Sequence, residues 1–121
     1  MEIRKVEKDK KKYLALLLLA DEQEDMIDRY LERGTMYVLE DGEVKAECVV
    51  AAEGDGVLEL KNIAVEPGFQ GKGYGKALVD FLIRTYSGRY AVLQVGTGDS
   101  LSTIPFYEAC GFRRHHLVKN F

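Results

Sequence analysis

Two alternating segments joined by Asp41-Gly42 limit the possible folds more than any other pattern in the chain. Residues 35–40 and 44–52 show the alternation of a β-strand. Asp-Gly favours the positive φ angles of a tight hairpin turn, so we expect these strands to run antiparallel. A third strand is expected at residues 57–65, after a turn at residues 53–56. A purely parallel sheet is therefore excluded.

Helical patterns lie on both sides of this strand region. Residues 10–20 form a strongly apolar helix, and Asp21-x-x-Glu24 then predicts a capping box that opens a second helix. We expect Gly34 to end this second helix in the left-handed conformation. Further segments complete the pattern: strands at 2–6, 90–95 and 112–118, and helices at about 75–86 and 103–110, the last capped by Gly111.

The resulting order, β-α-α-β-β-β-α-β-α-β, defines the fold class. It predicts an α+β protein in which a mixed, mostly antiparallel sheet is flanked by helices. The length of 121 residues predicts a single domain over residues 1–121.

Charge and cysteine content narrow the functional classes. The chain has 17 Lys and Arg residues and 20 Asp and Glu residues, so its net charge is −3. This negative charge argues against nucleic acid as a partner. The apolar run at residues 13–20 is far shorter than the roughly 20 residues of a membrane span, so no membrane association is expected. Cys48 and Cys110 form no CxxC motif, and we interpret them as buried thiols in a reducing cytoplasm.

The most informative motif is the glycine-rich stretch at residues 70–76. It follows a strand and opens a helix, so its backbone N–H groups can converge on an anion such as a pyrophosphate. A Walker A motif would need glycine at position 70, where the chain has Gln70, and GxGxxG would need glycine where the chain has Lys76. Both nucleotide motifs are therefore excluded.

The pattern that fits is Gln/Arg-x-x-Gly-x-Gly/Ala, through Gln70, Gly73 and Gly75. Here the chain resembles the GNAT superfamily of N-acetyltransferases, and residues 62–67 and 106–112 are similar to two further motifs of that family. The resemblance implies acetyl-CoA as cosubstrate, and residues around the loop as its binding site: Gln70, Gly71, Lys72, Gly73, Tyr74, Gly75 and Lys76.

The resemblance also implies roles for residues outside the loop. Main-chain groups of Ile63 and Val65 would bind the pantetheine arm and polarise the thioester carbonyl. Tyr107 would protonate the departing thiolate, although it can also be read as a core aromatic residue. Ser100 stands where GNAT chains often carry asparagine, and it would bind the cofactor arm more weakly.

Glu59 is the predicted general base. Period-two alternation places Glu59, Ile63 and Val65 on one face of the strand, and Glu59 lies six residues before Val65, the spacing of the catalytic glutamate in the histone-acetylating branch of GNAT. Two alternatives remain open. Glu59 can be an exposed carboxylate paired with Lys61, and ordered water can serve as the base instead.

These inferences predict an acetyl-CoA-dependent N-acetyltransferase that acts by direct transfer in a ternary complex. A non-catalytic acyl-CoA sensor and a generic nucleotide-binding protein are the competing interpretations. The acceptor is left open between a small-molecule amine and a peptide or protein amine. No metal is expected, since the adjacent His115 and His116 would point to opposite faces of a strand.

The C-terminus departs from the GNAT pattern. GNAT domains usually end in a two-stranded hairpin, whereas this sequence ends at Phe121, about ten residues after Gly111. We therefore expect the last family strand to be missing, because the sequence is shortened or because a partner subunit, as in a homodimer, supplies the edge.

Overall fold

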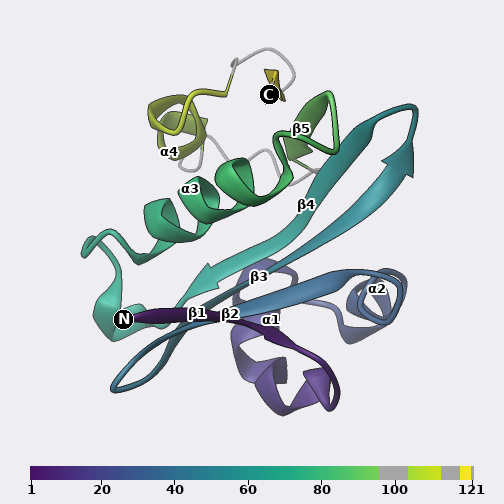
Figure 1. Cartoon of the computed structure of the whole chain (residues 1–121). Coiled ribbons are helices and arrows are strands. Elements are labelled where there is room, and N and C mark those ends of the chain that lie inside the picture. Colours follow the sequence, from purple (N-terminus) through teal and green to yellow (C-terminus); the bar gives the residue numbers. More distant parts are fainter. Residues whose placement is uncertain (96–103, 113–117, 121) are drawn as a thin grey trace.

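The computed structural model describes residues 1–95, 104–112 and 118–120. Within these residues, six strands form one sheet in the order β1-β2-β3-β4-β5-β6 (Figure 1). The strands are β1 (Glu2–Val6), β2 (Thr35–Asp41), β3 (Glu43–Gly54), β4 (Val57–Val65), β5 (Val92–Val95) and β6 (Val118–Asn120). Neighbouring strands pair antiparallel except β4 and β5, which are parallel. The α+β class and the expected order of elements are confirmed.

Helices cover both faces of the sheet (Figure 1). The helical segments are η1 (Lys10–Tyr13), α1 (Leu14–Ala20), α2 (Glu24–Asp28), η2 (Pro67–Phe69), α3 (Tyr74–Tyr86) and α4 (Ile104–Ala109). Leu78 and Leu82 of α3 belong to one buried cluster, while Leu17 of α1 and Ile27 of α2 belong to a second. We call the two sides of the sheet the α3 face and the α1 face. Burial of apolar side chains on both faces is the main force that holds the helices in place.

The predicted hairpin is confirmed, with Gly42 at a φ of 80°. Gly111 also adopts the predicted left-handed conformation, with a φ of 99°. Gly34 does not, and that prediction is wrong. A Cβ atom at Gly34 would lie 2.8 Å from the carbonyl oxygen of Tyr30 and 2.8 Å from Cγ1 of Val49. Glycine is therefore required there by close packing and not by its backbone angle.

The predicted capping box is also wrong. Helix α2 begins at Glu24 and its N-cap is Gln23, with no side-chain capping bond. The carboxylate of Asp21 instead accepts a hydrogen bond of 3.2 Å from the hydroxyl of Tyr30. Asp21 lies too far ahead of the helix to cap it, because the chain at Asp21 is still extended as it leaves α1.

Of the predicted strand at residues 112–118, the structure describes only the two ends: Phe112 is not in a strand, and Val118 begins one. The described strand, β6, covers residues 118–120 and pairs with β5. Residues 113–117, which include His115 and His116, lie outside the described residues. Cys48 and Cys110 are both free and buried, as expected.

Candidate active site

The glycine-rich loop has the backbone geometry that an anion-binding site needs. Gly71 and Gly73 have φ angles of 79° and 88°, and an added Cβ at either position would meet nothing within 4 Å. Gly73 is the N-cap of α3, a helix of 13 residues whose first N–H groups point toward the loop. Gln70 ties the loop to β4, since its side-chain amide donates a 3.3 Å hydrogen bond to the carbonyl of Val65. The loop therefore presents backbone donors at the positive end of a helix dipole.

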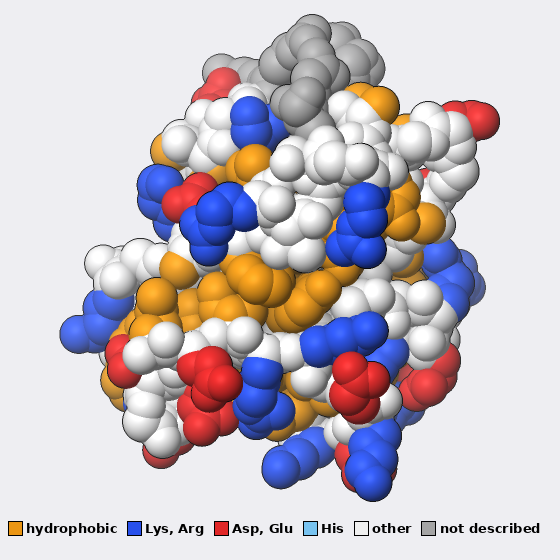
Figure 2. All heavy atoms as spheres, in the orientation of Figure 1, with side chains coloured by type: hydrophobic (Ala, Val, Ile, Leu, Met, Phe, Trp, Pro, Cys, Tyr) orange, Lys and Arg blue, Asp and Glu red, His pale blue; other side chains and the backbone are white. Residues whose placement is uncertain are grey.

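A cavity of about 530 Å³ lies beside this loop, and we call it the cosubstrate cavity. It brings together the loop, the end of β4 and two aromatic residues of α4. Its lining residues are Leu19, Ile63, Ala64, Val65, Phe69, Gln70, Gly71, Gly73, Tyr74, Gly75, Lys76, Phe106 and Tyr107. Figure 2 shows hydrophobic side chains gathered in a band across the middle of this side of the molecule. An apolar channel that ends at an anion-binding loop fits a long acyl carrier with a phosphate end.

Most of the residues that the sequence suggested for acetyl-CoA meet in this cavity. Lys72 belongs to the loop but does not line the cavity. Ser100 lies outside the described residues. Sequence reasoning missed Leu19, Phe69 and Phe106, since an apolar side chain in a helix or turn carries no signal that separates a cavity wall from the core.

Two polar contacts fix the first turn of α3. The hydroxyl of Tyr74 donates a 2.7 Å hydrogen bond to Asp41 in the β2–β3 hairpin. The ammonium group of Lys76 forms an ion pair of 2.9 Å with Asp80, one turn further along the helix, and this contact raises the pKa of Lys76. Lys76 therefore remains positively charged beside the loop.

Tyr107 lies in the wall of the cosubstrate cavity. Its side chain is 8% exposed and packs edge-on against Phe106 and Phe112. Removal from water raises the pKa of Tyr107 to about 12, with a smaller contribution from Cys110. The phenol is thus protonated at neutral pH and can donate a proton or a hydrogen bond.

Glu59 does not share a face with Ile63 and Val65, so that prediction is wrong. The β3–β4 register shifts between Val49, which pairs with Asn62, and Val50, which pairs with Leu60. Lys61 is the extra residue of a bulge, and a bulge reverses the alternation beyond it. Accordingly, Leu60 before the bulge and Ile63 after it both contact the α3 cluster.

Glu59 instead faces a second, charged hollow on the α1 face, which we call the charged groove. This groove has a volume of about 640 Å³ and lies beside α2. Its lining residues are Ala20, Asp21, Glu22, Gln23, Met26, Arg29, Tyr30, Arg33, Glu59 and Lys61. The sequence suggested only a helix-capping role for Asp21 and no role for Arg29 or Arg33, so it offered no sign of this groove.

A network of charges organises one end of the charged groove. The ammonium group of Lys61 lies 2.6 Å from Glu53 and also pairs with Glu59, and Gln94 of β5 donates a hydrogen bond to Glu59. Hydrogen bonds from Lys61 and Arg33 lower the pKa of Glu53. The pairing of Glu59 with Lys61, which the sequence left open as an alternative role, is therefore present, but the Glu59 side chain is only 13% exposed and is not the exposed carboxylate of that alternative.

Among residues 1–95, 104–112 and 118–120, no group of three or more His, Cys, Asp or Glu side chains could hold a metal ion. In the same part of the chain, no helix is long and apolar enough to cross a membrane.

A mixed sheet with a glycine-rich loop at the start of α3, and an apolar cavity beside that loop, is the arrangement that the resemblance to coenzyme A-dependent acyltransferases predicted. Residues 32–114 match the acetyltransferase (GNAT) domain family. The chain belongs to this family and is an N-acetyltransferase that uses acetyl-CoA.

Individual relatives agree with this assignment. An uncharacterized N-acetyltransferase of Bacillus subtilis, YvbK, is 37% identical over 88% of this chain and 70% of its own length. A GNAT acetyltransferase of Elizabethkingia anophelis, solved with acetyl-CoA bound, is 32% identical with a TM-score of 0.85, over 93% of this chain and 75% of that one. The glucosamine 6-phosphate N-acetyltransferase of Trypanosoma brucei brucei is 38% identical over 51% of this chain and 42% of its own length.

Proposed function

We propose that this protein transfers the acetyl group of acetyl-CoA to a primary amine by direct attack within a ternary complex. The observation that carries this proposal is that neighbouring residues of α1, and residues on either side of Asn62 in β4, line two different hollows, one mainly apolar and one charged. Leu19 lines the cosubstrate cavity, and the next residue, Ala20, lines the charged groove. On β4, Ile63 faces the cavity and Lys61 the groove. An acceptor in the groove would therefore reach the thioester from the side opposite to the cofactor arm.

The charges of the groove support a small amine that also carries an anionic group. Arg29 forms no ion pair within the described part of the chain, while Asp21 and Glu22 offer carboxylates to an ammonium group. Glucosamine 6-phosphate, the substrate in the name of the trypanosome relative, is an amine of this kind. A peptide or protein amine is the alternative that the acceptor screen below distinguishes.

Glu59 is the base of this proposal. An alkyl ammonium group has a pKa of about 10.4, so a proton must be removed before the nitrogen can attack. Glu59 faces the groove through which the amine would arrive, and its carboxylate would take the proton directly or through one water molecule. If it does not, ordered water alone takes this role.

The remaining steps fall to residues of the cosubstrate cavity. Backbone groups of Ile63 and Val65 would hold the pantetheine arm and polarise the carbonyl, while the N–H groups of residues 71–75 hold the pyrophosphate. Tyr107 would give its proton to the sulfur as the carbon–sulfur bond breaks.

The experiment is an acceptor screen with acetyl-CoA that records the release of free thiol. Amino sugar phosphates, amino acids, polyamines and lysine peptides would be compared, with Arg29→Gln as a matched variant. We expect the fastest turnover with an amine that bears an anionic group, and a higher KM for that amine alone in Arg29→Gln. Absence of turnover with every amine, despite tight binding of acetyl-CoA, would favour the non-catalytic sensor.

We also propose that the protein works in the cytoplasm. Both cysteines are free thiols, which fits a reducing compartment.

A further inference from the structure

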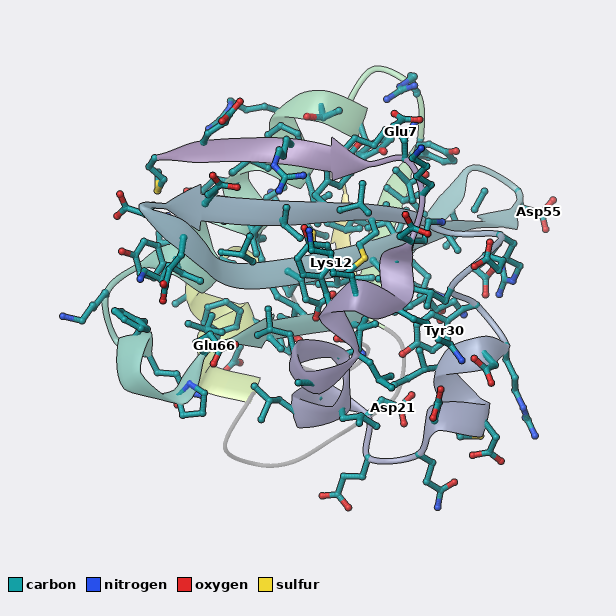
Figure 3. All side chains as sticks on the ribbon, turned by 90° about the horizontal axis from the view of Figure 1, so that it is seen from below. Glu7, Lys12, Asp21, Tyr30, Asp55 and Glu66 are labelled. Atoms are coloured by element: carbon teal, nitrogen blue, oxygen red, sulfur yellow. The ribbon has the colours of Figure 1, made fainter. Side chains whose placement is uncertain are left out.

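Asn62 is a buried polar residue that none of the roles above uses. It lies in β4 directly after the bulge residue Lys61, and only 3% of it is exposed. Its amide nitrogen donates two hydrogen bonds, each of 3.0 Å, to the carbonyl oxygen of Leu17 and to the hydroxyl of Tyr30. The Tyr30 hydroxyl donates in turn to Asp21. Figure 3 shows Tyr30 and Asp21 on the same side of the molecule, beside α1 and α2.

Each partner of Asn62 belongs to a wall of the proposed site. Leu17 lies in the last turn of α1, two residues before Leu19, which lines the cosubstrate cavity. Tyr30 lines the charged groove. Ile63, the neighbour of Asn62 in the chain, lines the cosubstrate cavity beside the proposed thioester position. One side chain therefore connects α1, Tyr30 and the end of β4.

The chemistry of this position argues against a purely structural anchor. The side-chain oxygen of Asn62 is buried and has no hydrogen-bond partner within the described residues. An unpaired carbonyl in a low-dielectric interior lowers stability, and an apolar side chain would pack against α1 without that cost. The side-chain amide of asparagine instead directs two N–H donors, one to Leu17 and one to Tyr30. These two hydrogen bonds fix the positions of Leu17 and Tyr30 relative to β4.

We infer that Asn62 is a positioning residue for acetyl transfer, which sets the alignment of the charged groove with the thioester at the end of the cosubstrate cavity. This inference rests on the proposed function, because it assumes that the acceptor lies in the charged groove. Asn62 touches neither hollow and acts through Tyr30, α1 and the backbone of Ile63. Small displacements of reacting groups reduce rates strongly, so alignment is where such a residue would have its effect.

The test compares Asn62→Ala, Tyr30→Phe and the double variant with the wild-type protein, using the amine that the wild type acetylates fastest. We expect kcat/KM for the amine to fall by roughly 10–100-fold in each single variant, because the groove loses its alignment. The dissociation constant of acetyl-CoA should change less than kcat/KM, since Asn62 itself does not line the cosubstrate cavity. The double variant should lose little more than the stronger single variant, because both changes break the same connection.

Tyr37→Phe is the matched control. It removes a buried tyrosine contact on the α3 face, the 2.6 Å bond between the hydroxyls of Tyr37 and Tyr86, and should lower the melting temperature without changing the kinetics.

Asn62 variants that lose only thermal stability, with normal kcat and KM, would overturn the inference, as would fully additive losses in the double variant. If Asn62→Ala does not fold, Tyr30→Phe retains the ring packing, and normal kinetics in that variant would overturn the inference. No turnover in the wild type would overturn the proposed function, and this inference with it.

Discussion

The ammonium nitrogen of Lys45 lies 3.8 Å from the centroid of the Phe69 ring. The Lys45 side chain is only 12% exposed, and Phe69, at the end of η2, lines the cosubstrate cavity. The carbonyl of Lys45 also accepts a 2.8 Å hydrogen bond from the N–H of Glu66. Strand β3 thereby holds the segment that leads from β4 into the glycine-rich loop.

Replacing Lys45 by methionine should weaken acetyl-CoA binding. A partly desolvated cation–π contact is worth about 0.5–2 kcal/mol, so we expect a loss of affinity of roughly two- to thirtyfold, with a smaller change in kcat. Calorimetric titration with acetyl-CoA measures this. Lys45→Arg, which keeps a cation over the ring, should bind nearly normally, and equal losses in both variants would contradict the cation–π explanation.

Substitution of Gly73 by valine should abolish tight binding of acetyl-CoA while the fold persists. The space around Gly73 is open, so the effect would come from its φ of 88°, which a β-branched residue strongly disfavours. Gly68→Ala is the control, because Gly68 is also uncrowded but has no positive φ. Unchanged affinity of Gly73→Val for acetyl-CoA would show that the glycine-rich loop does not bind the cosubstrate.

Tyr107→Phe should lower kcat by roughly 10²–10⁴-fold, as for other single acid–base groups, with little change in the melting temperature. The ring contacts with Phe106 and Phe112 survive in this variant, and only the hydroxyl is lost. Tyr90→Phe, on a tyrosine that packs edge-on against Tyr86, serves as the control. Normal turnover in Tyr107→Phe would show that the Tyr107 hydroxyl has no part in catalysis and that the residue serves only in packing.

Glu59→Gln should reduce turnover at neutral pH and regain part of it at higher pH, where the free amine is already deprotonated. The matched control is Glu53→Gln, because Glu53 is the other carboxylate paired with Lys61 but does not line the charged groove. The measurement is kcat/KM against pH for the three proteins. Superimposable profiles for wild type and Glu59→Gln would leave ordered water as the base.

Glu47 should make the stability of the fold depend on pH. It lies in β3, is fully buried, and neither carboxylate oxygen has a hydrogen-bond partner among the described residues. Burial raises the pKa of Glu47 well above its usual range. Above about pH 4.3 the unfolded chain releases a proton that the folded protein keeps, so stability falls as pH rises from there toward the folded-state pKa.

Glu47→Gln removes this dependence while nearly preserving volume. The melting temperature of Glu47→Gln minus that of the wild type should increase as pH is raised from about 5 to about 8. Each kcal/mol of unfolding free energy that the wild type loses over this range corresponds to roughly 2–8 °C. Thermal unfolding at several pH values measures the difference. Parallel curves for the two proteins would show that Glu47 titrates alike in the folded and unfolded states.

The sequence by itself determined the order of elements and the nature of the main ligand site. Alternation and Asp41-Gly42 predicted the β2–β3 hairpin, since both act between near neighbours in the chain. The spacing of Gly71 and Gly73 ahead of a helix predicted the loop, because positive φ angles and helix N-termini are local properties. The GNAT resemblance identified the family from the same residues.

Only the tertiary structure decided which side chains face each hollow. The bulge at Lys61 has no local signature, because it arises from how β4 registers against β3, and it moved Glu59 to the face opposite Ile63. The charged groove joins residues of α2 to residues of β4 that lie about 30 positions further along the chain. Asn62 and Glu47 look like ordinary polar residues of half-exposed strands, but both are buried in the folded protein, and Asn62 is bonded to Leu17 of α1. Burial, register and contact between distant segments are properties of the packed chain, and no local pattern encodes them.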